Sequence, residues 1–218
     1  MAGVGDGFGC LLDSEGTVSC FGNNTLGQCN VPPGVVFSSV SCGAAHACGV
    51  TTGKRVLCWG SNDQGQAPTT LPLNLTLDML VVDCGHAHTC AISMFADVLC
   101  WGRNAELQLQ VPFDGKAVHV SAGGRITCTI DIFGVAACRG DSLDSPVTTS
   151  IDPTTALSSF VQLTAGNRHA CLLRSRTGTF ACWGSNEEGQ LSYQPLEFSH
   201  IAVGPFSVCG IKMLTGEV

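Results

Sequence analysis

Charged side chains are scarce in this sequence. Asp, Glu, Lys and Arg together supply 12% of its 218 residues, whereas a soluble globular domain usually has about a quarter. Acidic residues outnumber basic ones by 17 to 10, so the formal net charge is −7. Binding to nucleic acid or to an anionic membrane surface requires a basic face. We therefore expect neither of these two functions.

Long apolar runs and targeting signals are also missing. No apolar run reaches the roughly eighteen residues that a membrane helix needs, and the most apolar stretch, Leu71–Val82, is interrupted by Asn74 and Asp78. The N-terminus has no basic region followed by an apolar one, so no signal peptide is visible. We expect no membrane insertion within this chain.

The motifs of common enzymes are absent as well. Carboxylates occur singly in turns and form no pair at a recurring distance that could serve general acid–base catalysis. The sequence contains no glycine-rich phosphate loop, nucleophile elbow or zinc-binding His-Glu helix. We expect a protein that is not an enzyme and that uses no cofactor.

The sequence does contain a repeat. A glycine is followed five residues later by a cysteine, and ten or eleven residues further on by a second cysteine. The leading glycines are 38, 42, 38, 43 and 38 residues apart, and a period of about forty residues indicates a repeat architecture. We place the repeats at residues 1–34, 35–76, 77–114, 115–157 and 158–195, followed by a partial repeat at 196–218.

Each repeat consists of short apolar segments separated by Gly, Asn, Asp and Pro. No amphipathic helix lies between them, which excludes βαβ units and leucine-rich repeats. Short antiparallel strands at this period predict an all-β fold, a β-propeller in which each repeat forms a blade and residues 1–218 form a single domain. A β-solenoid is the alternative, although its coils usually repeat at shorter lengths.

The two cysteines of each repeat are symmetric about a turn. Cys48 and Cys58 are equidistant from Gly53, so a hairpin that turns there sets them opposite each other, close enough for a disulfide. The last pair is one residue further apart and needs a longer turn or a bulge. We predict five disulfides within hairpins: Cys10–Cys20, Cys48–Cys58, Cys90–Cys100, Cys128–Cys138 and Cys171–Cys182. Such bonds indicate an oxidising compartment; the alternative is that cysteine serves as a small buried apolar residue.

Two further sequence patterns could mark a zinc site and N-glycosylation sites. The segment Cys84-Gly-His86-Ala-His88-Thr-Cys90 would present four potential zinc ligands on one face of a strand. All of these positions except His86 recur in other repeats without such a cluster. We therefore expect no metal, and we expect the recurring histidines to hydrogen-bond a neighbouring blade's backbone.

Asn23 and Asn74 each begin an N-glycosylation pattern. Asn74 is the better candidate because it lies in the insertion that lengthens the second repeat.

The second repeat is the clearest copy of the motif, with Cys58-Trp59-Gly60 followed by Asn62 and Gly65-Gln66. The pattern G-x-x-H-x-C-x-h…G-x-V-h-C-W-G-x-N-x-x-G-Q, where h is apolar, resembles the repeats of the regulator of chromosome condensation family. Its cysteine-rich form is similar to the propellers of Crinkly-type plant receptor-kinase ectodomains. The resemblance implies a seven-bladed ring, of which this chain, with five repeats and a partial one, would be a fragment.

We therefore expect a non-enzymatic scaffold that binds a protein partner and is secreted or part of an ectodomain. The contacts would come from loops that depart from the repeat: Pro68–Asp78, Gln108–Lys116 and Asp141–Ser158. Two alternatives stay open. The resemblance also allows a cytoplasmic or nuclear guanine-nucleotide exchange factor for a small GTPase, as in the founding member of the family. It equally allows an ectodomain fragment of a receptor-like kinase.

Overall fold

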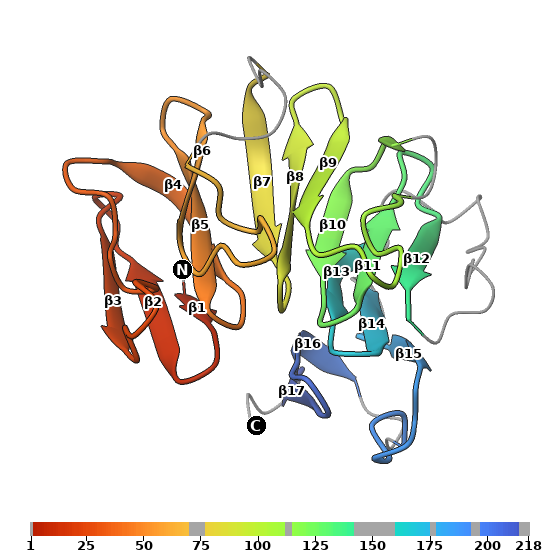
Figure 1. The fold of residues 1–218 in the computed structure, drawn as a ribbon. Helices are drawn as coiled ribbons and strands as arrows, with labels where there is room; N and C mark the ends of the chain where they lie inside the picture. Colours follow the sequence, from red (N-terminus) through yellow and green to blue (C-terminus); the bar gives the residue numbers. More distant parts are fainter. Residues whose placement is uncertain are drawn as a thin grey trace. The chain divides into compact units, whose positions relative to one another are not determined.

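The computed structural model describes residues 2–69, 77–111, 115–141, 160–174, 178–192 and 197–213. The fold is all-β, as predicted, and the described strands form separate antiparallel sheets, one for each repeat (Figure 1). The chain divides into two compact units, unit 1 with residues 1–105 and unit 2 with residues 106–218. That residues 1–218 form a single domain stays a prediction.

Unit 1 contains three sheets, and each is a meander of three strands in chain order. The strands are β1 (Ala2–Val4), β2 (Phe8–Leu12), β3 (Val18–Gly22), β4 (Phe37–Cys42), β5 (His46–Thr51), β6 (Val56–Gly60), β7 (Met79–Cys84), β8 (His88–Ser93) and β9 (Val98–Gly102).

Unit 2 contains two sheets of three strands and one of two described strands. The strands are β10 (His119–Ala122), β11 (Ile126–Ile130), β12 (Ala136–Gly140), β13 (Phe160–Ala165), β14 (His169–Arg174), β15 (Phe180–Gly184), β16 (Phe198–Val203) and β17 (Val208–Lys212). Within the described residues, no helix is long and apolar enough to cross a membrane.

The second and third strands of each complete sheet form the hairpin that the cysteine spacing predicts. The strand register places the two cysteines of every pair directly opposite each other. The structure joins all five pairs as disulfides, with Cα–Cα distances of 4.0 to 4.1 Å. In the last hairpin the extra residue lengthens the turn, because the Arg174 amide donates to the carbonyl of Thr179, five residues on, whereas the Thr51 amide donates to that of Arg55, four residues on.

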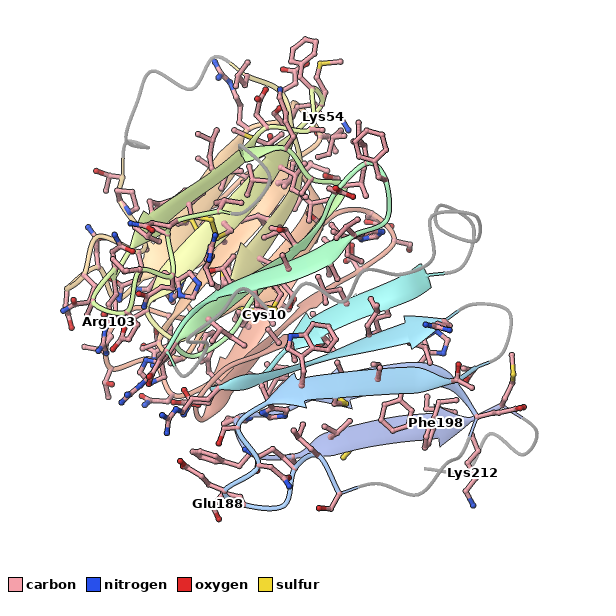
Figure 2. The ribbon with its side chains drawn as sticks, turned by 90° about the vertical axis from the view of Figure 1, so that its right-hand side faces the viewer. Cys10, Lys54, Arg103, Glu188, Phe198 and Lys212 are labelled. Atoms are coloured by element: carbon pink, nitrogen blue, oxygen red, sulfur yellow. A yellow bond between two sulfur atoms is a disulfide. The ribbon has the colours of Figure 1, made fainter. Side chains whose placement is uncertain are left out.

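The core of each unit lies between successive sheets. In the middle sheet of each unit, the central strand is buried along its length except at its last residue, Thr51 in β5 and Arg174 in β14. A strand covered on both faces carries small and apolar side chains throughout rather than an alternating pattern. Larger residues fill the space at the ends of the sheets: Phe198 packs edge-on against Phe180 with the ring centroids 5.1 Å apart (Figure 2).

Candidate interaction surface

The Asn-x-x-Gly-Gln loops that follow the third strands are closed by their own side chains. In the second repeat, the side-chain oxygen of Asn62 accepts from the amide of Ala67 at 2.9 Å, and that of Gln66 accepts from the amide of Gln64 at 2.8 Å. Gly65 turns the chain with φ of 78°, a conformation that glycine adopts without strain. The buried glutamines of three other repeats make the same contact: Gln28, Gln108 and Gln190.

These loops also hold the next sheet in place. The indole nitrogen of Trp59 donates to the carbonyl oxygen of Gln28, and that of Trp101 to the carbonyl oxygen of Gln66, each at 3.0 Å. Both indoles are buried in the core between sheets. The tryptophan and glutamine of the repeat therefore serve as a structural lock between sheets, and we assign them no role in binding.

The recurring histidines lie inside the molecule. Nε2 of His46 contacts the hydroxyl of Thr89 in the next sheet at 2.9 Å, so the partner of this ring is a side chain and not the backbone that we expected. A hydroxyl at this position of the neighbouring central strand reaches the ring before any main-chain group does. Burial lowers the pKa of His46 to about 3 and that of His88 to about 4. Both rings are neutral at physiological pH.

The four residues of the possible zinc cluster do not form a shared site. His86 is exposed, His88 is fully buried, and Cys90 is bonded to Cys100. The structure instead brings Cys84 close to His46 and Cys48, with the potential ligand atoms within 4.8 Å of one another. Cys48 is already bonded to Cys58, so this group is not a ready-made metal site.

The sites that were predicted in loops are only partly described. Asn23 is exposed, and its side-chain oxygen accepts from the amide of Thr25 at 3.0 Å. Asn74 lies outside the described residues, and so does most of each loop at Pro68–Asp78 and Asp141–Ser158. Glycosylation and partner binding at these positions stay predictions.

A different surface distinguishes the two units. We call the turn between the first and second strands of each sheet, directly after the leading glycine, its first turn. At the second residue of this turn, unit 1 has small residues throughout, whereas unit 2 has large ones: Gly7, Ala45 and Ala87 against Arg125, Arg168 and Phe206. Successive first turns of unit 2 are hydrogen-bonded to each other, from the Arg125 amide to the Asn167 carbonyl and from the Asn167 amide to the Pro205 carbonyl.

Ion pairs fix the two arginines at this surface. Arg125 and Arg168 both contact the carboxylate of Asp141, at 3.0 and 3.3 Å, and Arg168 also contacts Glu187 at 3.3 Å. The side chains are partly exposed, so each pair adds little to stability. The pairs orient the guanidinium groups rather than hold the fold together.

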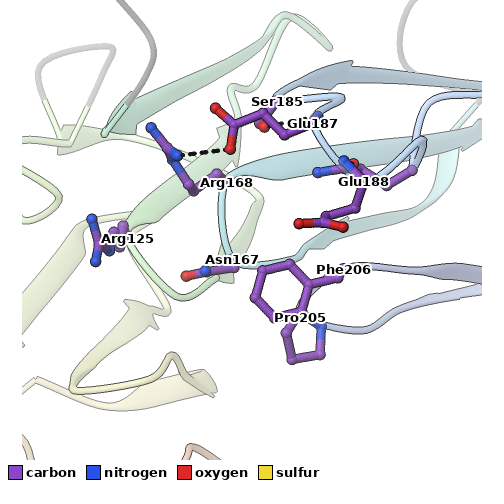
Figure 3. Close-up of a pocket in the computed structure, with 9 residues that line it drawn as sticks. Arg125, Asn167, Arg168, Ser185, Glu187, Glu188, Pro205 and Phe206 are labelled. Atoms are coloured by element: carbon purple, nitrogen blue, oxygen red, sulfur yellow. Dashed lines mark hydrogen bonds and ion pairs between the residues drawn. The ribbon is translucent and has the colours of Figure 1, made fainter.

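A pocket opens between these first turns and the glutamine loop at Ser185–Gln190 (Figure 3). Its volume is about 140 Å³. The aromatic ring of Phe206, of which 57% is exposed, lines the pocket together with Glu188. Among the described residues, no hydrogen-bond or ion-pair partner contacts the Glu188 carboxylate. Sequence analysis did not predict this surface. It could have been found from the large side chains of unit 2 at the second position of the first turn, where the residues of unit 1 are small.

Known proteins share both the repeat and the fold. A model of the regulator of chromosome condensation (RCC1) repeat matches residues 37–66 and 160–190. The CRINKLY WD40 ectodomain of the Arabidopsis thaliana receptor kinase ACR4 is 25% identical, with a TM-score of 0.73 over 96% of this chain and 73% of that one. The entire ectodomain of the Physcomitrella patens receptor kinase CR4 is also 25% identical, with a TM-score of 0.78 over 98% of this chain and 58% of that one.

A more distant structure has the same fold. Prp20p from Saccharomyces cerevisiae, solved in a study of its binding to Gsp1p and histones, is 14% identical with a TM-score of 0.79, over 97% of this chain and 69% of that one. At this identity the likeness concerns the fold alone. Two segments of the chain thus match the RCC1 repeat, and the fold is that of RCC1-like β-propellers.

Proposed function

We propose that this chain is a non-enzymatic scaffold that binds a protein partner through the first turns and the pocket of unit 2. The observation that carries the proposal is the change of residue type at one repeat position. The blades need only a small residue at the second position of the first turn, as Ala45 and Ala87 illustrate, yet unit 2 presents large side chains there: Arg125, Arg168 and Phe206. Binding residues lie disproportionately on loops that a rigid scaffold holds in position.

The charges around the pocket favour a basic side chain of the partner. Two guanidinium groups, of Arg125 and Arg168, face three carboxylates, so one negative charge is left uncompensated at the Glu188 carboxylate. A lysine or arginine placed there would pair with Glu188 and lie against the ring of Phe206, and a cation over an aromatic face is attracted to it. The net charge of −7 would add long-range attraction for such a partner.

The size of the pocket argues for a protein rather than a small-molecule ligand. Its volume of about 140 Å³ is well below the roughly 300–1,000 Å³ of typical small-molecule sites. The space suits one inserted side chain, while the neighbouring first turns supply additional contact area. We therefore expect the pocket to be one part of a larger protein interface.

A displayed library of random peptides, selected on the folded chain, tests this function. We expect enrichment of peptides with Lys or Arg, and Phe206→Ala or Glu188→Gln should weaken the best peptide about threefold to tenfold, measured by fluorescence anisotropy. The matched control is Phe21→Ala, which removes a ring of similar exposure, 58%, from unit 1. Selected peptides that bind both unit 2 variants as tightly as the unchanged chain would contradict the proposed surface.

The compartment that we propose is extracellular. Support comes from the five hairpin disulfides and from the likeness to receptor-kinase ectodomains, since such bonds persist in oxidising compartments. Alkylation of the protein from its native source, unfolded without reductant, should label four of the fourteen cysteines: Cys29, Cys42, Cys84 and Cys209. Labelling of all fourteen would contradict secretion and favour the intracellular exchange-factor alternative.

Glycosylation follows from the same proposal. If the chain passes through the secretory pathway, Asn74 is the better acceptor, because Asn23 uses its side-chain oxygen within its own turn. Treatment of the native protein with an N-glycosidase should lower its mass, and peptide mapping should assign the deamidated site to Asn74. An unchanged mass would count against modification at either position.

A further inference from the structure

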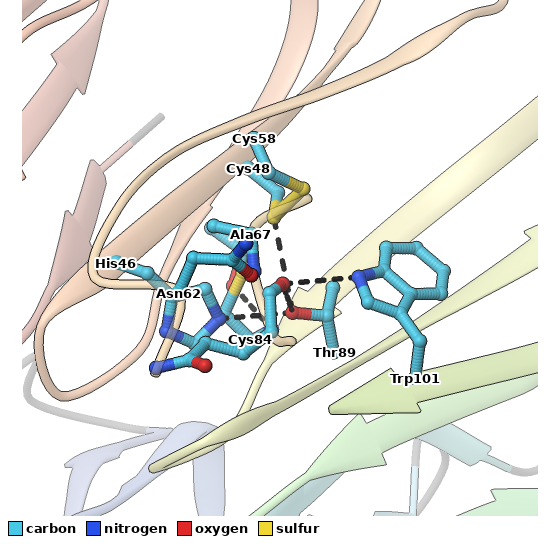
Figure 4. The surroundings of a disulfide bond; sticks show 10 residues. His46, Cys48, Cys58, Asn62, Ala67, Cys84, Thr89 and Trp101 are labelled. Atoms are coloured by element: carbon cyan, nitrogen blue, oxygen red, sulfur yellow. Dashed lines mark hydrogen bonds between the residues drawn. A yellow bond between two sulfur atoms is a disulfide. The ribbon is translucent and has the colours of Figure 1, made fainter. Parts of the chain in front are cut away.

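A free thiol lies next to a disulfide inside unit 1. Cys84, at the end of β7, is buried, and its sulfur is within 4.8 Å of the sulfur of Cys48 in β5. Cys48 is bonded to Cys58 across its own hairpin. A ring nitrogen of His46 is within the same 4.8 Å. Figure 4 shows the three cysteines around the hydroxyl of Thr89, which contacts the Cys48 sulfur at 3.8 Å.

A cysteine at this repeat position, packed beside the preceding hairpin disulfide, occurs twice in unit 1. It is absent from the described part of unit 2. Cys42 holds the position of Cys84 one repeat earlier and packs in one core cluster with the disulfide Cys10–Cys20. In unit 2 this position is Ala165, which packs against Cys128–Cys138, and then Val203, which packs against Cys171–Cys182. The cysteines are therefore not required by the packing at this position, since alanine and valine also fill it.

We propose that Cys84 and the Cys48–Cys58 disulfide form an internal thiol–disulfide exchange site. The sulfur of Cys84 attacks the sulfur of Cys48, a bond forms between these two atoms, and the bond from Cys48 to Cys58 breaks with Cys58 as the leaving thiolate. The proton that leaves Cys84 ends on Cys58. The exchange consumes no oxidant and no reductant.

The product would change how the sheets are held together. The original disulfide joins β5 and β6 within one sheet, whereas a Cys48–Cys84 bond joins β5 to β7 of the next sheet. Exchange would thus convert a bond inside a blade into a covalent link between two blades. It would also release Cys58, which is only partly buried, as a thiol.

Burial sets the rate of this reaction. The thiolate is the attacking species, and burial raises the pKa of the Cys84 thiol well above its ordinary value. Only a very small fraction of Cys84 is therefore ionised in the folded protein near neutral pH. We expect an exchange that is slow in the resting structure and that accelerates when water reaches the Cys84 thiol while it stays next to Cys48.

A variant that removes the leaving sulfur traps the new bond. Cys58→Ser, equilibrated in a buffer of reduced and oxidised glutathione, should form Cys48–Cys84 in most molecules, as read by peptide mapping without reductant. The matched control in unit 2 is Cys138→Ser, in which the remaining Cys128 faces Ala165 and should end as a free or glutathionylated thiol. A Cys58→Ser protein whose Cys48 and Cys84 both stay unbonded to each other would overturn the proposal.

The unchanged protein provides a second measurement that does not depend on the folding of a variant. During several days at neutral pH and 37 °C, aliquots are alkylated and mapped without reductant. The Cys48–Cys84 peptide and alkylated Cys58 should increase together and exceed any link between Cys84 and a unit 2 cysteine by about tenfold. Cys84→Ala should abolish the signal. Alkylation that stays on Cys84, with Cys48–Cys58 intact throughout, would refute the exchange.

Discussion

The two units treat the same tryptophan position differently. In unit 1 the indole nitrogen of Trp101 donates to the carbonyl oxygen of Gln66, in the glutamine loop of the preceding sheet. In unit 2 the repeat before Trp183 has no Gly-Gln sequence, and the indole nitrogen meets the Cys138 sulfur at 3.3 Å. Divalent sulfur is a weak acceptor. The lock between sheets therefore needs two successive repeats, one that supplies the tryptophan and a preceding one that supplies the glutamine loop. When one repeat loses its glutamine loop, the tryptophan of the next repeat loses its carbonyl acceptor.

The first turns differ between the units in the opposite sense: here unit 2, and not unit 1, carries the larger side chains. Unit 1 keeps the complete lock and has a small second residue in each first turn, such as Ala45. Unit 2 has lost part of the lock and carries Arg168 and Phe206 at that position. Residues that hold the sheets together and residues that face solvent occupy separate repeat positions. One set can therefore diverge without disturbing the other, which is how a repeat scaffold acquires a binding surface.

Acid pH should produce the largest effect, because it separates central strands that begin with a buried histidine from one that does not. The central strands β5 and β8 of unit 1 begin with His46 and His88, and β14 of unit 2 begins with His169, whereas β11 of unit 2 begins with Ile126. Burial lowers the pKa of His46 to about 3 and that of His88 to about 4, below the value of about 6.5 that holds in the unfolded chain. The contribution of neutral histidine to stability is therefore complete above about pH 6.5 and is lost as the pH falls from there towards the folded values.

At about pH 4.5 we expect a loss on the order of 2 kcal/mol for each of these histidines. Hydrogen–deuterium exchange, corrected for the intrinsic rate at each pH, should show lost protection in β5 and β8 but little change in β11. His88→Ile, which copies the residue of β11, should restore acid resistance to β8. Equal losses in all three strands would contradict a role of the buried histidines in acid sensitivity.

The tryptophan contrast predicts a smaller effect. Trp101→Phe and Trp183→Phe remove similar amounts of buried ring, so the difference between them reports the indole hydrogen bond. The loss at Trp101 should be larger by about 1 kcal/mol, because its acceptor is a carbonyl oxygen; the value stays modest since Thr89 also donates to that oxygen. Urea unfolding followed by circular dichroism measures both. Identical losses would mean that the lock contributes nothing beyond packing.

Local spacing allowed the hairpins to be predicted but not the surface between sheets. Cys48 and Cys58 are ten residues apart and symmetric about a turn, so their register follows from strand geometry alone. Cys84 reaches Cys48 only because successive sheets stack, and a contact of that kind depends on a blade spacing that sequence pattern does not encode. The repeat shows that Cys84 shares its position with Cys42, but it could not show which sulfur Cys84 faces.

The pocket was harder to foresee for a related reason. Arg125, Glu188 and Phe206 come from different sheets of unit 2, and each is an ordinary turn residue when read in its own repeat. The loops that we expected to bind were chosen by length and by departure from the pattern. First turns keep their length, so only a comparison of side-chain size across repeats could have identified them.

The smallest effect concerns one position of the glutamine loops, and its sign depends on whether that position holds a glycine or a leucine. Leu107 in unit 2 adopts φ of 62°, where Gly65 of unit 1 has 78°, and this conformation strains residues with a Cβ. Gly65→Ala, which meets nothing within 4 Å, should cost about 1 kcal/mol, and Gly189→Ala provides the same test in unit 2. Leu107→Gly should stabilise by roughly 0.5 kcal/mol, because relief of strain exceeds the added chain entropy of glycine. A rise in Tm of about 1–2 °C would follow; a fall would mean that the leucine side chain contributes more than its backbone strain costs.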